Sequence, residues 1–160
     1  MVKSTSSKGQ TLSYDFFIAS TIFLVIVIII FGYWTYSMKE IQETQEKEEA
    51  FNTLIEASQI WFKEGYPKYW DNETVVEIGL SNDGIINETK LNLLTSIGYQ
   101  KFLSFMNLGK FNVFYNVTNE TSIVFQFGNP PSQQANDIYQ MKRVGILNGQ
   151  AVKIKTILWD

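Results

Sequence analysis

An uncharged apolar stretch near the amino terminus constrains this chain more than any other feature. From Phe16 to Met38 the sequence runs for 23 residues without a charged residue or a proline. As an α-helix, that stretch measures about 35 Å, which is long enough to cross the hydrocarbon core of a bilayer. A polar leader with Lys3 and Lys8 precedes it, and a single acid, Asp15, stands at its edge. We therefore expect a transmembrane helix to which the rest of the chain is attached.

Composition excludes several classes of function. The chain contains neither histidine nor cysteine, so disulfides, thiolate zinc sites and thiol nucleophiles are excluded, and the commonest metal ligand and general base is missing. No paired carboxylates with a supporting base and no glycine-rich phosphate loop occur. We expect no catalytic residue, no metal and no cofactor. The net charge of −3, without a basic cluster, argues against a nucleic-acid partner.

Three interpretations of the amino terminus compete. A cleaved secretory signal peptide needs a shorter apolar core followed by small residues, whereas Gly32-Tyr33-Trp34-Thr35-Tyr36 is bulky. A signal anchor explains the length, the aromatic belt and an orientation with the lysines inside and Glu40 to Glu49 outside. It does not explain Gly9-Gln10 directly before the apolar run, nor an acid at Asp15, where a charge is costly. A third interpretation, cleavage on the cytoplasmic side of the apolar helix, explains both.

The segment Lys8-Gly9-Gln10-Thr11-Leu12-Ser13-Tyr14-Asp15 resembles the class III signal peptide of archaeal type IV pilins and related archaellin-like subunits. That family has a basic residue and glycine before the cut, glutamine as first mature residue, a serine shortly after it and an acid near the fifth position, followed by an apolar helix. The resemblance implies that Gly9 ends the leader and Gln10 begins the mature chain. It also implies that Asp15 pairs with the charged amino terminus of a neighbouring subunit.

The segment departs from the family pattern in two respects. The acid is aspartate rather than glutamate, and Ser13 and Asp15 each fall one position late if the cut precedes Gln10. A cut after Gln10 restores the spacing but loses the family's first residue. The register of cleavage therefore stays open, as does the simpler role of Asp15 as a residue at the membrane boundary.

The resemblance implies a structural role. The chain would be a major or minor subunit of a type IV pilus-like surface filament, with a role in adhesion or surface attachment. Its partners would be copies of itself or related pilins, a prepilin peptidase, and an assembly ATPase with its membrane platform. It would sit in the membrane with an extracellular head before it enters the filament. The alternative is a membrane-anchored extracellular binding module that does not polymerise.

The amino-terminal half predicts one long helix. No proline and only Gly32 interrupt the sequence between Thr11 and Lys63, and Gly65-Tyr66-Pro67 predicts the helix end. Lys39 to Glu49 holds seven charges among eleven residues, which is typical of a solvated or inter-subunit face. An apolar stripe at helical spacing follows and predicts packing on a domain; its residues are Phe51, Leu54, Ile55, Ser58, Trp61 and Phe62. These patterns divide the chain into leader 1–9, apolar helix 10–38, helical stalk 39–64 and extracellular head 65–160.

The head predicts an α+β fold with a small antiparallel sheet and one inserted helix. Val75 to Leu80 reads as a short strand and Ser81 to Gly84 as a turn. Thr89 is the expected cap of a helix that ends between Asn107 and Gly109. Two hairpins follow: the first joins Phe111–Val117 to Ser122–Phe127, and the second joins Ile138–Leu147 to Ala151–Leu158 through Asn148-Gly149.

Four Asn-x-Thr triplets occur in the head, and they are possible N-glycosylation sites. The asparagines are Asn72, Asn87, Asn116 and Asn119. One such triplet is weak evidence because asparagine and threonine also suit turns. Four of them near predicted turns and strand ends fit a surface exposed outside the cell.

Overall fold

The computed structural model describes residues 8–160, with side chains from Tyr14 onward. The chain forms two compact units, the first ending at Glu46 and the second comprising Lys47–Asp160. The leader residues 1–7 lie outside the described part. Gly9 and Gln10 belong to the first helix by their backbone, and the side chain of Gln10 lies outside the described part too.

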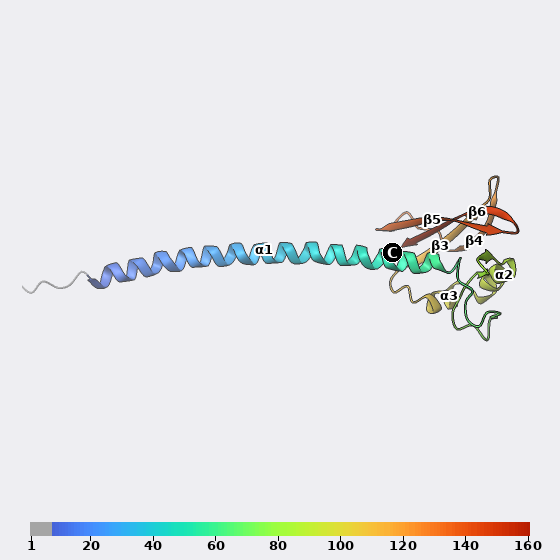
Figure 1. Ribbon diagram of the computed structural model, residues 1–160. Helices are drawn as coiled ribbons and strands as arrows, with labels where there is room; N and C mark the ends of the chain where they lie inside the picture. Colours follow the sequence, from blue (N-terminus) through green and yellow to red (C-terminus); the bar gives the residue numbers. More distant parts are fainter. Residues whose placement is uncertain (1–7) are drawn as a thin grey trace, which may run out of the picture. The chain divides into compact units, whose positions relative to one another are not determined.

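The long amino-terminal helix is confirmed. Helix α1 comprises Lys8–Gln59 (Figure 1), and it ends earlier than predicted, at Gln59 instead of near Gly65. After Gln59 the backbone forms hydrogen bonds with a distant part of the chain: Leu80 N donates to Ile60 O at 2.7 Å, and Ser81 N donates to Lys63 O at 2.9 Å. These tertiary bonds replace the helical ones, so the helix stops before its sequence signals.

The helix packs on the head through small residues as well as large ones. Four residues of this part of the helix are buried, namely Ala50, Leu54, Ala57 and Ser58. By contrast, Phe51 of the predicted stripe is 54% exposed. The alanines bring the helix backbone close to the sheet, and the Tyr115 hydroxyl donates to Ala57 O at 2.8 Å. The predicted stripe is therefore right for Leu54 and Ser58 and wrong for Phe51 and for Phe62, which is 37% exposed. Trp61 is buried, but it and Phe62 lie beyond the end of α1.

The segment after α1 contains a small hairpin that the sequence did not reveal. Val75 to Leu80 is not a strand, and its β-bridge among the described residues joins Glu77 to Tyr66. Strands β1 (Ser81–Asn82) and β2 (Ile85–Ile86) pair instead. Asp83 and Gly84 form the two-residue turn with φ of 50° and 80°, the backbone that such tight hairpins require.

Two helices replace the single inserted helix. Helix α2 comprises Glu88–Ile97 and helix α3 comprises Tyr99–Met106. Gly98 separates them with φ 80° and ψ 153°, a backbone conformation that only glycine adopts readily. The cap of α2 is Asn87, whose side chain accepts from Lys90 N, and not Thr89.

Four longer strands complete a six-stranded sheet of order β1-β2-β5-β6-β3-β4. The predicted hairpins are confirmed as β3 (Asn112–Thr118) with β4 (Ile123–Gly128), and β5 (Ile138–Leu147) with β6 (Gln150–Trp159). Every pairing is antiparallel except that of β2 with β5. The α+β class is therefore confirmed, with a mixed sheet.

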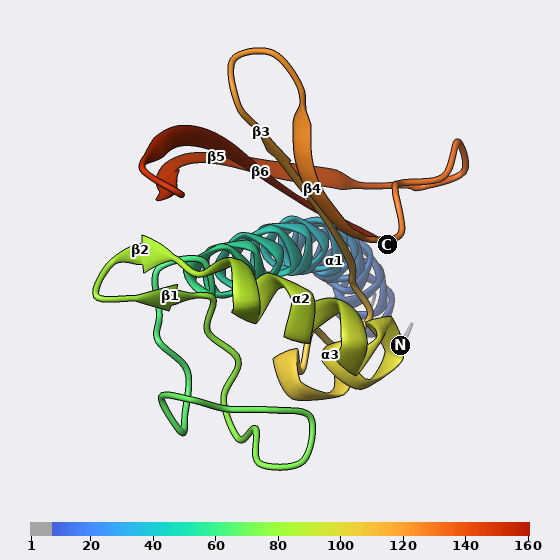
Figure 2. The same cartoon turned by 90° about the vertical axis from the view of Figure 1, so that its right-hand side faces the viewer.

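The second unit has a core of its own. Strands β3 to β6 lie on one side of residues 47–59 of α1, and α2 and α3 lie on the other (Figure 2). Edge-to-face aromatic contacts join these layers: the Trp61 ring lies 5.5 Å from Tyr115, and Phe102 lies 6.0 Å from Tyr115 and 5.2 Å from Phe127. These buried rings all belong to the second unit.

Candidate functional site

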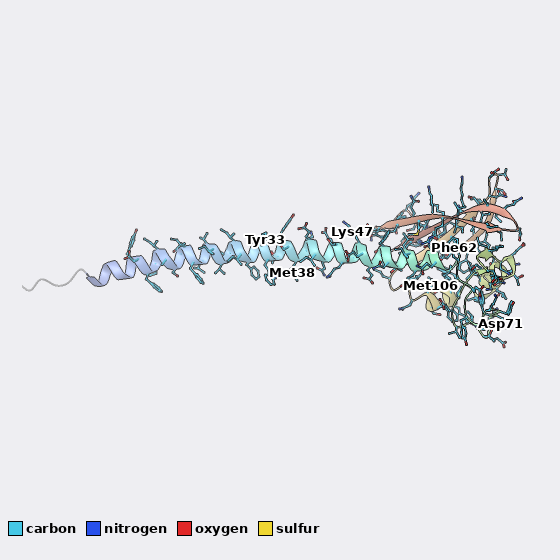
Figure 3. The ribbon with its side chains drawn as sticks, in the orientation of Figure 1. Tyr33, Met38, Lys47, Phe62, Asp71 and Met106 are labelled. Carbon is cyan, nitrogen blue, oxygen red and sulfur yellow. The ribbon has the colours of Figure 1, made fainter. Side chains whose placement is uncertain are left out.

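The described part of the first unit is a helix whose apolar side chains are uncovered. Every large apolar residue from Phe16 to Met38 is between 42% and 73% exposed. Figure 3 shows the side chains of Tyr33 and Met38 projecting outward from α1. The helix is long and apolar enough to cross a membrane. A continuous apolar surface of this size needs a cover of lipid or protein.

The two threonines of the apolar run have partners inside the helix. Thr21 Oγ1 donates to Phe17 O at 2.8 Å, and Thr35 Oγ1 donates to Gly32 O at 2.9 Å. A hydroxyl without a partner is costly in an apolar environment. These intrahelical bonds therefore suit the run to a membrane or to the interior of a helix bundle.

Asp15 is exposed on α1, between Tyr14 and Phe16, which are 68% and 70% exposed. Because α1 begins at Lys8, its first turn carries no acid. Asp15 therefore lies about two turns after the start of α1. Removal of the leader before Gln10 would bring the new amino terminus to within six residues of it.

The charged segment Lys39 to Glu49 also lies on α1, and we name it the acidic segment. It holds five glutamates and two lysines. Its one ion pair among the described residues joins Lys39 and Glu43 at 3.9 Å, and both side chains are well exposed. Such a pair contributes little to stability. The segment is thus an acidic helix surface with nothing in the described chain that neutralises it.

Asn72 and Asn119 lie in turns of the head. Asn119 Oδ1 accepts from Ser122 N at 2.7 Å and from Thr121 N at 3.0 Å, which shapes the turn between β3 and β4. Asn72 Oδ1 accepts from the Ser96 hydroxyl at 3.0 Å. Both side chains are partly exposed.

The other two asparagines belong to regular structure. Asn87 caps α2 through its bond from Lys90 N. Asn116 lies within β3, which pairs with β4 and β6 on its two sides, and its Oδ1 is buried without a hydrogen-bond partner. The four triplets therefore differ in environment, with Asn116 the most enclosed by hydrogen-bonded backbone.

Sequence reasoning missed a buried lysine in the head. Lys90 is 4% exposed, and its Nζ donates to Glu64 O and to Ser81 O, the latter at 2.9 Å. Burial lowers the pKa of Lys90, and the charge of Glu64 opposes that shift. Lysine on a predicted helix gives no signal of burial, because lysine is nearly always exposed. Its bonds tie the segment after α1 to β1, which is a structural role.

The described residues contain no group of three or more Asp or Glu residues arranged to hold a metal ion. Comparisons with family models, with curated proteins and with solved structures found no match for this chain. The geometry therefore stands alone as the basis for a functional conclusion: an uncovered apolar helix joined to a folded head.

Proposed function

We propose that this protein is a structural subunit of a type IV pilus-like surface filament. The observation that supports this proposal is the apolar face of α1, exposed on all sides from Phe16 to Met38 and directly continuous with a folded head. In the membrane, lipid covers this surface. In a filament, the same helices of neighbouring subunits cover it, and the heads lie outside.

The junction before the apolar run supports a pilin rather than a simple anchor. Gly9-Gln10 and Asp15 resemble the processing site and acid of archaeal pilins. Sequencing of the amino terminus of protein from cells tests this. A chain that begins at Gln10 or Thr11 supports processing by a prepilin peptidase, and the result also fixes the register. An intact Met1 leader contradicts the proposal and favours a membrane-anchored binding module.

Asp15 would neutralise the amino terminus of an adjacent subunit inside the apolar bundle, where an unpaired charge is expensive. We expect Asp15→Ala to abolish or strongly reduce filaments seen by electron microscopy, while the protein still inserts in the membrane. Asp15→Glu should retain assembly, since it keeps the charge. Normal filament yield from Asp15→Ala would mean that Asp15 only marks the membrane boundary.

Assembly would require the ATPase and membrane platform that such filaments use, and adhesion or surface attachment would be the downstream role. A structural role fits a chain without histidine or cysteine. The alternative, an extracellular binding module, shares the anchor and the head but remains monomeric. Chemical cross-linking on intact cells separates the two, because a filament gives a ladder of multimers and a monomeric module gives none.

Glycosylation of the head would shield an exposed filament surface. Asn119 is the favoured site of the four because it lies in a turn at the end of a hairpin. Mass spectrometry of protein from cells should find glycan on the peptide with Asn119, and Asn119→Gln should remove it. Modification confined to Asn116 would contradict this ranking.

A further inference from the structure

The outer face of the sheet is basic and unpaired. Strands β3 to β6 carry four basic residues and no acid; the basic residues are Lys142, Arg143, Lys153 and Lys155. Lys142, Lys153 and Lys155 lie on the face opposite the core, since they alternate with inward residues such as Met141, Ile154 and Thr156. None of the three forms an ion pair with a described residue. We name these three lysines the basic face.

The arrangement of the basic face does not serve the stability of the head. Lys142 and Lys155 are direct cross-strand partners between β5 and β6, and like charges directly opposite one another destabilise a sheet. Val144, the partner of Lys153, is 67% exposed, and Ile146 is 48% exposed. Positive charge and exposed apolar side chains together on one sheet face are features of an interaction surface.

The proposed assembly creates a matching need for positive charge. Packed helices lie about 8–10 Å apart, which is close to the screening length at physiological salt. Bundling of the apolar runs would therefore bring the acidic segments of neighbouring copies, each with five Glu and two Lys, within repulsive range. Each acidic segment carries three more negative than positive charges, and each basic face carries three unpaired lysines.

The acidic segment also offers apolar contact. Ile41 is 51% exposed and lines a shallow groove on α1 together with Ser37, Glu40, Thr44 and Gln45. Val144, the cross-strand partner of Lys153 in the basic face, has a side chain of suitable size for this groove. Charge and apolar surface therefore match between the two surfaces.

We propose that the basic face of one copy docks on the acidic segment of a second copy in the filament. This inference rests on the proposed function. It assigns the outer sheet face to an inter-subunit contact and leaves the opposite, α2–α3 side of the head outward. The interaction is electrostatic, so filaments should loosen as the salt concentration rises.

Charge reversal in the full-length chain tests the contact. Reversing the charge of all three lysines should lower filament yield about tenfold, equivalent to about 1.4 kcal/mol. The changes are Lys142→Glu, Lys153→Glu and Lys155→Glu. Adding the three compensating changes in the acidic segment should restore the yield; they are Glu40→Lys, Glu46→Lys and Glu49→Lys. A matched control set reverses exposed acids elsewhere and should not restore it; the changes are Glu56→Lys, Glu73→Lys and Glu120→Lys.

A second measurement tests the contact even if the charge-reversed chain folds poorly. Because the chain has no cysteine, two can be introduced cleanly, as Val144→Cys with Gln45→Cys. Oxidised filaments should give a reducible ladder of multimers, and the control pair Glu73→Cys with Gln45→Cys should give none. The inference would be overturned if filaments of the Val144→Cys, Gln45→Cys chain gave no ladder and if lysine reversal left the filament yield unchanged. The proposed function would remain intact in that case.

Other occupants of the basic face are distinguishable. If the head bound vesicles rich in anionic lipid through these lysines while filament yield stayed unchanged on their reversal, the face would belong to a membrane contact and the inference would be wrong. Absence of filaments from the wild-type chain under the same conditions would instead contradict the proposed function itself.

Discussion

Lys90 is the buried charged side chain of the described head, and its two bonds to the carbonyls of Glu64 and Ser81 define its role. Lys90→Met should lower the free energy of unfolding of the head by about 1–3 kcal/mol, because both carbonyls lose a buried donor. Urea titration followed by tryptophan fluorescence measures this. Lys101→Met is the control, since Lys101 makes an exposed bond to Asn72 O; equal losses from both changes would contradict the prediction.

Asp71 provides a pH-dependent test. Its Oδ1 accepts from Thr74 N at 2.8 Å, Glu73 N at 2.9 Å and Thr74 Oγ1 at 2.9 Å, and these bonds lower the pKa of Asp71 below its usual value near 3.8. A lowered carboxyl pKa stabilises the folded state above the usual value, and this stabilisation is lost as the pH falls through the lowered one. The gap in urea midpoint between wild type and Asp71→Ala should therefore be constant near neutral pH and close below about pH 3.8. A gap that persists at about pH 2 would show that Asp71 acts through neutral hydrogen bonds.

At the scale of elements, Asn87 combines a helix cap with a glycosylation triplet. Asn87→Ala should cost the head about 1 kcal/mol because the bond from Lys90 N is lost. Asn87→Asp removes the triplet but keeps an acceptor at the cap, so it should retain nearly full stability. Thermal unfolding of both variants tests this, and equal destabilisation by alanine and aspartate would assign the effect to something other than capping.

The break between α2 and α3 depends on the backbone of Gly98. A Cβ at this position would meet nothing within 4 Å, so any cost of Gly98→Ala comes from its φ of 80°. We expect a loss of about 1–3 kcal/mol in the unfolding free energy. Gly32→Ala, in open space on α1, should leave unfolding of the head unchanged. A neutral Gly98→Ala would mean that the two helices can join into one.

At the scale of the whole molecule, the first unit exposes an apolar surface that lipid or protein must cover, whereas the second unit has a hydrophobic core of its own. All residues of the described hydrophobic core lie between Ala50 and Leu158, within the second unit. A fragment of residues 47–160 should therefore remain monomeric without detergent and unfold cooperatively, with a free energy of about 5–15 kcal/mol. Denaturant unfolding and size-exclusion chromatography measure this. A fragment that aggregates or unfolds gradually would mean that residues 8–46 are needed for the head to fold.

The sequence by itself determined the features that depend on local composition. The apolar run Phe16 to Met38 needs no tertiary contact to be helical, and Asn148-Gly149 gives the turn of the β5–β6 hairpin through its backbone preference alone. The alternation of apolar and polar residues predicted β3 and β4, because this alternation is also a local pattern. For the site, the sequence predicted the exposed helix and the acidic segment.

Tertiary structure alone decided where these elements stop and which side chains are covered. Helix α1 ends at Gln59 because residues 60–63 form hydrogen bonds with residues 80–81, which are distant in sequence. Ala50 is buried instead of Phe51 because the helix backbone lies close to the sheet, and Lys90 is buried because two distant carbonyls accept its bonds. The basic face likewise exists only because β5 and β6 pair in a register that places their lysines together. Each of these depends on partners far away in the chain, which no local pattern contains.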